Sequence, residues 1–157
     1  MGLIEITIEI VDYIALSDLV NRYASLVDSR SFSDVASLFA EDGELIVPEP
    51  PSSMAPVKRL FGRESIKSEL SRLIDFELTF HELVGTVFEL GDSPEYAYGK
   101  IKCVAHHVMR KGSENTDLMW HLHYSDSYRK IDNKWHLARR EICIDMIDVR
   151  SIKRVRS

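Results

Sequence analysis

Cysteine is scarce in this sequence. Of the 157 residues only two are cysteines, Cys103 and Cys143, and they form no CxxC pair. A disulfide framework needs more cysteines at short spacings, so it is excluded. We therefore expect a reduced, cytoplasmic protein in which both thiols fill the core.

Long apolar runs are absent as well. The N-terminal run from Ile4 to Ile10 is cut by Glu5 and Glu9, and no basic segment precedes it. It fits neither a signal peptide nor a membrane span, so we expect no export and no membrane partner. Its isoleucines occupy every second position, which favours a strand, although the run also fits an extension of the helix that follows.

The chain carries no strong excess of one charge. Its formal net charge is −5 and 45% of its residues are hydrophobic, which is typical of ordinary globular domains. We expect no nucleic-acid partner, because the one basic segment, residues 150–156, is short and fits a solvated chain end. The length predicts one domain spanning residues 1–157, since domains peak near about 100–150 residues.

Familiar catalytic motifs are also missing. The sequence contains no GxGxxG, GxxxxGK[ST], GxSxG or HExxH pattern. Each of these motifs places a phosphate-binding loop, a nucleophilic serine or a zinc ligand pair. Nucleotide-dependent and serine-nucleophile chemistry are therefore disfavoured.

What is present in the first half is helical periodicity. Apolar side chains recur at three- and four-residue steps over 12–27, which predicts an amphipathic helix that Asp28 follows directly. Ser31 fits the N-cap of a second helix over 32–39, and a third helix is predicted over 62–74.

Between the second and third helices we expect mainly irregular structure. A short strand is predicted over 44–47. Residues 48–56 hold four of the five prolines and two serines, which predicts a loop able to cover a pocket mouth.

The second half is rich in β-branched and aromatic residues, divided by turn signals. This pattern predicts four antiparallel strands over 76–90, 96–111, 117–130 and 134–149. Helices followed by strands indicate an α+β fold in which three N-terminal helices pack on a curved, mostly antiparallel sheet. We expect a cone-shaped α+β barrel that encloses a pocket.

All six histidines fall inside predicted strands. Strand alternation places His107 on the apolar face of its strand with Ile101, Cys103 and Ala105, and turns His106 to water. On the next strand one face mixes aromatic bulk with a carboxylate and fits a pocket lining: Trp120, Leu122, Tyr124, Asp126 and Tyr128. The opposite face carries His121 and His123, an HxH pair without a recognisable third ligand, so we expect no metal.

Four segments together resemble the SnoaL-like branch of the nuclear-transport-factor-2-like superfamily. They are residues 19–43, 61–66, 81–86 and 128–135, and the likeness spans roughly residues 14–148. The resemblance implies a cone of three helices and a curved sheet around a pocket. It also implies a homo-oligomer, a dimer or a trimer, formed through one face of the sheet.

The resemblance further implies a catalytic pair. Within the superfamily the pattern is most similar to scytalone dehydratase and to hexachlorocyclohexane dehydrochlorinase, whose paired aspartate and histidine match Asp28 and His81. A second histidine of scytalone dehydratase matches His107. Tyrosines of that enzyme are replaced here by Val27 and Val47, which puts its particular substrate in doubt.

We therefore expect a cofactor-independent lyase or isomerase, dehydratase-like, acting on a small, largely apolar cyclic substrate. Asp28 would orient His81 as the base, with His107, Tyr124 or Asp126 donating to the leaving group. Substrate contacts are expected from Tyr23, Trp120, Tyr124 and Asp126.

Ordinary structural roles stay open for the pair, namely a core histidine satisfied by a backbone group and an aspartate that closes a turn on its own backbone. An alternative function is a non-catalytic ligand-binding or assembly subunit of the same fold, like the β subunit of ring-hydroxylating dioxygenases.

Overall fold

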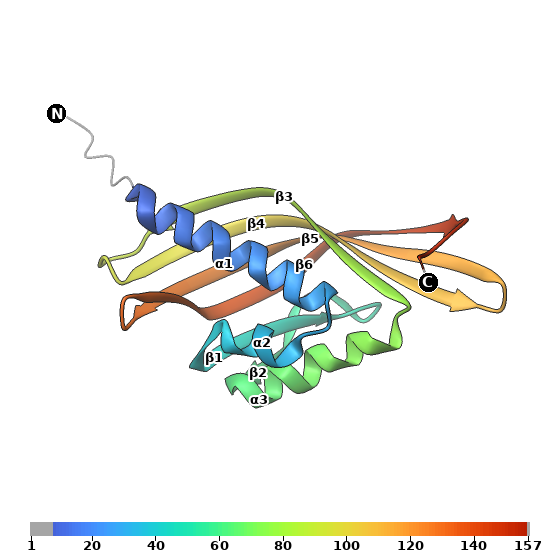
Figure 1. Cartoon of the computed structure of the whole chain (residues 1–157), viewed down its shortest axis with the longest axis horizontal. Helices are drawn as coiled ribbons and strands as arrows, with labels where there is room; N and C mark the ends of the chain where they lie inside the picture. Colours follow the sequence, from blue (N-terminus) through green and yellow to red (C-terminus); the bar gives the residue numbers. More distant parts are fainter. Residues whose placement is uncertain (1–7, 157) are drawn as a thin grey trace.

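Three helices cover one face of a six-stranded sheet in the computed structural model, which describes residues 8–156 (Figure 1). The strand order is β2-β1-β6-β5-β4-β3. All neighbouring pairs are antiparallel except β1 and β6, which run parallel. The predicted α+β class, with three helices on a curved and mostly antiparallel sheet, is confirmed.

Helix α1 (Ile10–Asp28) presents one apolar face to the sheet, as predicted. Its buried residues are Leu16, Leu19, Val20, Tyr23, Ala24 and Val27. After Asp28 the chain turns sharply at Arg30, which has a positive φ of 61°. Ile10 is helical, whereas Ile4 and Ile6 of the predicted N-terminal strand lie outside the described residues.

Helix α2 (Phe32–Ser37) is shorter than predicted, because strand β1 (Phe39–Glu49) begins two residues later. The predicted loop over 48–56 is largely wrong. Most of it belongs to β1 and to strand β2 (Ser53–Phe61), which pair as a hairpin. Its prolines are tolerated because β2 is an edge strand and the ladder is irregular between Val47 and Glu49.

Helix α3 (Gly62–Leu70) and the 3₁₀ helix η1 (Ser71–Asp75) occupy the predicted third helix. Gly62 starts α3 with a positive φ of 78°, a conformation that suits glycine. Arg63 of α3 donates from Nε to the carbonyl oxygen of Phe39 at 2.9 Å, which ties this helix to the start of β1.

The four long strands agree with the prediction to within a few residues. They are β3 (Leu78–Leu90), β4 (Tyr96–Lys111), β5 (Glu114–Ile131) and β6 (Lys134–Ile152). Tight turns join the last three, and Gly112, Asp132 and Asn133 take the positive φ angles that such hairpins require.

The sheet is curved but not closed, since β2 and β3 both end it. The predicted barrel is therefore formed by sheet and helices together, with α1 beside β3 and α3 beside β1. We call the face covered by the helices the inner face and the opposite one the outer face. No helix within the described residues is both long and apolar enough to cross a membrane.

Candidate active site

A bulge in β3 sets which residues of this strand face inward. The pairing with β4 shifts between Leu83 and Gly85, so one extra residue, Val84, is inserted. Before the bulge Thr79 and His81 lie on the inner face, and after it Phe88 does. The histidine therefore reaches the interior from an edge strand, close to the end of α1.

Asp28, the last residue of α1, is hydrogen-bonded to this strand in three places. Its Oδ1 lies 2.6 Å from His81 Nδ1 and accepts from Thr79 Oγ1 at 3.1 Å. Its Oδ2 accepts from the backbone N–H of His81 at 2.8 Å. Three donors from one strand fix the carboxylate, which in turn orients the imidazole so that Nδ1–H donates to Asp28 and Nε2 is left for the cavity.

His81 lines a cavity of about 120 Å³ between the sheet and the helices. Its side chain is only 7% exposed, whereas that of Asp28 behind it is 22% exposed. Most of the cavity wall is apolar or aromatic. The wall comprises Tyr23, Val27, Val47, Pro48, Glu69, Leu70, Leu73, His81, Ala105, His107, Trp120, Leu122, Tyr124 and Ile142.

His107 is the second histidine of the cavity wall. Its Nδ1 lies 3.2 Å from the carbonyl oxygen of Leu118, so the Nδ1–H donates to it. Burial, together with repulsion from His81, lowers the pKa of His107 to about 4. The ring is therefore neutral near pH 7, and its Nε2 is a hydrogen-bond acceptor rather than the donor we expected.

The aromatic side of the cavity is formed by Tyr23, Trp120 and Tyr124. Burial raises the pKa of the Tyr23 and Tyr124 phenols, so both hydroxyls stay protonated and can act as donors. The ring of Trp120 packs on that of His107 with 4.7 Å between centroids. The structure thus brings all three predicted contact residues to the cavity.

Asp126, the fourth predicted contact residue, does not line the cavity. Its two carboxylate oxygens accept from Arg140 at 2.9 and 2.7 Å and from the Tyr128 hydroxyl at 2.6 Å, and the ion pair is fully buried. With both oxygens occupied, this carboxylate is not placed to donate to a leaving group. The face assignment holds, but the role proposed from sequence does not fit.

Arg140 was missed by the sequence analysis. Its guanidinium carbon lies 4.1 Å from the ring centroid of Tyr23 and 4.0 Å from that of Tyr124, directly behind the aromatic wall. Strict alternation from Trp135 would turn it outward, but β6 carries an irregularity opposite Ser127 and Tyr128 that reverses the phase.

The cavity adjoins a wider vestibule of about 430 Å³. The two share Pro48, Glu69 and Trp120. At the vestibule Glu69 is bound by Lys58 at 2.7 Å and by Arg72 at 3.3 Å. The β1–β2 hairpin therefore takes the place of the predicted proline loop beside the pocket.

The family model described as the SnoaL-like domain matches residues 9–141 of the chain. None of the curated proteins matches the sequence.

Solved structures share the fold over nearly the whole chain. A scytalone dehydratase-like protein from Novosphingobium aromaticivorans is 25% identical with a TM-score of 0.75, covering 94% of this chain and 91% of that one. An aromatic ring hydroxylase-like protein from the same organism is 19% identical with a TM-score of 0.75, covering 93% and 96%. A hexachlorocyclohexane dehydrochlorinase, LinA type 2, is 16% identical with a TM-score of 0.74, covering 92% and 91%.

Proposed function

Because this chain belongs to the SnoaL-like domain family, we propose that it is a cofactor-independent lyase or isomerase of the dehydratase type. The observation that carries the proposal is the Asp28–His81 hydrogen bond of 2.6 Å at the wall of an apolar cavity. Similarity to a scytalone dehydratase-like protein and to a dehydrochlorinase supports elimination as the reaction.

The proposed base is Nε2 of His81. It takes a proton from a carbon of the substrate, and the electron pair left behind forms a carbon–carbon double bond as a hydroxyl group leaves from the neighbouring carbon. The imidazolium returns the same proton to the departing oxygen as water is released, so the enzyme ends as it began. Asp28 stabilises the imidazolium between these two steps.

The aromatic side of the cavity suits the negative charge that develops on the substrate. Tyr124 and Tyr23 offer neutral hydroxyl donors, and the Arg140 guanidinium lies directly behind their rings. In a buried site such preorganised groups act with little screening by water. His107 accepts a hydrogen bond from a substrate hydroxyl, which its neutral state allows.

The size of the cavity supports a small cyclic substrate. An apolar cavity of about 150 Å³ holds one benzene molecule, and the cavity here is smaller, about 120 Å³. We therefore propose that the substrate has a single ring and that its substituents extend into the adjoining vestibule of about 430 Å³.

The alternative remains a non-catalytic subunit that binds a ligand or assembles with another protein. The similarity to an aromatic ring hydroxylase-like protein supports it. It differs from the enzyme proposal in needing no free base, so replacement of His81 would leave its ligand binding intact.

A β-hydroxycyclohexanone is a suitable first probe. The enzyme proposal predicts loss of water to cyclohexenone, and slower loss when the carbon that His81 deprotonates carries deuterium in place of hydrogen. Asp28→Asn should reduce this turnover roughly 10²- to 10³-fold, because a wrongly oriented imidazole loses most of its catalytic effect. Either orientation of the amide sets its NH₂ group against a donor, namely His81 Nδ1–H or the backbone N–H.

Thr79→Val is the matched control, since it removes one hydrogen bond to Asp28 and leaves both members of the pair. Turnover should fall less than about tenfold. Equal turnover of wild type and Asp28→Asn would contradict the mechanism. Binding without turnover in the wild type, unchanged by the variant, would favour the alternative.

We also propose a cytoplasmic homo-oligomer, a dimer or a trimer. Several apolar side chains of the outer face are exposed, among them Val87, Tyr98 and Met146. Burial of such side chains between copies would stabilise an assembly. Sedimentation velocity measures its mass, and a monomer at micromolar concentration would contradict this proposal.

A further inference from the structure

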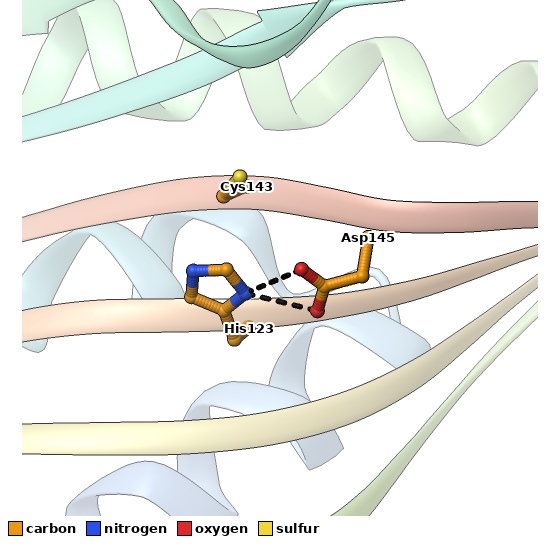
Figure 2. A group of neighbouring side chains, drawn as sticks. All are labelled: His123, Cys143 and Asp145. Atoms are coloured by element: carbon orange, nitrogen blue, oxygen red, sulfur yellow. Dashed lines mark hydrogen bonds and ion pairs between the residues drawn. The ribbon is translucent and has the colours of Figure 1, made fainter.

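Three potential metal ligands meet on the outer face of the sheet. His123 comes from β5, and Cys143 and Asp145 come from β6 (Figure 2). One ligand atom of each lies within 4.8 Å of the others. Within residues 8–156 this is the single such group of histidine, cysteine and acidic side chains.

The strand pairing explains why the three side chains converge. Cys143 lies directly opposite His123 in the antiparallel ladder. The next residues of β6 are irregular, because Ile144 pairs with Leu122 but Met146 pairs with His121, which leaves Asp145 without a partner. This bulge gives Asp145 the freedom to lean back toward His123, where its carboxylate oxygens lie 2.9 and 3.0 Å from Nδ1.

We propose that His123, Cys143 and Asp145 bind a divalent transition-metal ion, with zinc as the natural occupant. Imidazole, thiolate and carboxylate are the three ligand types that proteins offer to zinc. Three protein ligands leave a fourth tetrahedral position for water. The group is distinct from the proposed catalytic pair, because it lies on the other face of the sheet and its residues come from other strands.

The distances between the three ligand atoms are close to those that a tetrahedral metal ion requires. With metal–ligand bonds of about 2.0–2.3 Å, tetrahedral ligand atoms are about 3.3–3.8 Å apart. The atoms here span from 2.9 Å to at most 4.8 Å, so they need small adjustments in both directions. Asp145, whose side chain is 55% exposed and stands at the bulge, can make the larger one.

The metal would take the place of a proton. In the metal-free protein the Nδ1–H of His123 donates to Asp145. A metal ion bound at Nδ1 requires the neutral ring to carry its proton on Nε2 instead, and the Cys143 thiol loses its proton as it becomes a thiolate. One proton therefore goes to solvent for each ion bound, so affinity should fall as the pH is lowered.

In a single copy of the chain the group is accessible from solvent, and one neighbouring charge opposes metal binding. His123 is 34% exposed and Cys143 is partly exposed rather than in the core, which corrects the expectation that both cysteines are core residues. Lys102 of β4 lies opposite His123 and adds positive charge. His121 is on the same face but outside the group, which makes it a matched control.

Titration with cobalt(II) under a non-chelating reductant tests the proposal, because cobalt replaces zinc and reports a thiolate ligand by a charge-transfer absorption band. The wild type should bind one equivalent and show this band. Cys143→Ser should abolish the band, and His123→Ala and Asp145→Asn should weaken binding at least about tenfold. Zinc should compete with cobalt and raise the melting temperature of the wild type.

His121→Ala should leave the band and the affinity unchanged. Circular dichroism of every variant shows whether it is folded. The proposal is overturned if the folded wild type gives no band at millimolar cobalt. It is equally overturned if the band persists in Cys143→Ser or is lost as fully in His121→Ala as in His123→Ala.

Discussion

His81 on the inner face of the sheet and His106 on the outer face are both bound to carboxylates, and they differ in which ring nitrogens remain free. On the inner face His81 uses one ring nitrogen for Asp28, at 2.6 Å, and the other is left for the cavity. On the outer face His106 uses both, with Asp117 on Nδ1 and Glu82 on Nε2, each at 2.6 Å.

The surroundings of the two histidines separate them further. Burial acts to lower the pKa of His106, but the Asp117 and Glu82 carboxylates outweigh it and raise the pKa overall. The two carboxylates therefore favour the cationic form of His106, and because both of its ring nitrogens are occupied, neither is free to take a substrate proton. In our proposal, the same pair of chemical groups acts as a base where one nitrogen stays free beside a cavity and as an ion pair where both nitrogens are occupied.

The largest expected effect is on turnover, when the proposed base His81 is replaced. His81→Gln should lower the turnover number by on the order of 10³-fold, because general-base catalysis contributes roughly 10²–10⁴. His106→Gln should change it less than about threefold. Steady-state kinetics of both variants measures the contrast. Comparable losses in the two would mean that the free nitrogen of His81 does not matter.

An effect of intermediate size is the loss of stability at acidic pH that His107 causes. Its pKa is lowered from 6.5 to about 4 in the fold, so the unfolded chain takes up the proton first as the pH falls. The free energy of unfolding therefore keeps its full value above about pH 6.5 and decreases as the pH falls to about 4. The loss amounts to about 3 kcal/mol, at about 1.4 kcal/mol per pKa unit.

Urea denaturation at several pH values between neutral and acid measures this loss. His107→Gln removes the titrating group, so its stability curve should be flatter over this range than that of the wild type. Parallel curves for the two proteins would contradict the low pKa of His107.

The smallest effect has the opposite sign and belongs to His106. Because its pKa is raised in the fold, its stabilising contribution is complete below about pH 6.5 and is lost as the pH rises through the raised value. The ion pairs are partly exposed, so we expect less than about 1 kcal/mol. The difference in unfolding free energy between wild type and His106→Gln, measured from pH 6 to pH 9, should shrink with rising pH.

Sequence periodicity predicted the helices and the long strands well, because their patterns extend over many residues. It failed at 48–56, where prolines suggested a loop, because an edge strand can contain residues that a central strand cannot. The pairing of Asp28 with His81 came from resemblance. Two residues that are 53 positions apart carry no local signal of their contact.

Bulges account for most of the remaining site residues that sequence could not place. Arg140 and Asp145 both follow or stand at an irregularity of β6, where the two-residue alternation changes phase. Asp126 was assigned to the correct face, but only packing shows that Arg140 occupies its oxygens. The other two members of the outer-face group, Cys143 and Asp145, were likewise invisible, since they follow His123 by about twenty residues and stand on another strand.

Because the cavity is smaller than its vestibule, a bound ligand can take only one orientation. A ring that fits beside His81 and His107 fills the inner chamber of about 120 Å³, and whatever it carries must trail outward past Trp120. The part of the ligand in the vestibule contacts Lys58, Glu69 and Arg72, which can form hydrogen bonds and ion pairs with polar substituents. Molecules of this shape would enter ring first, so the reacting carbon is selected by its distance from the polar end before any bond is broken.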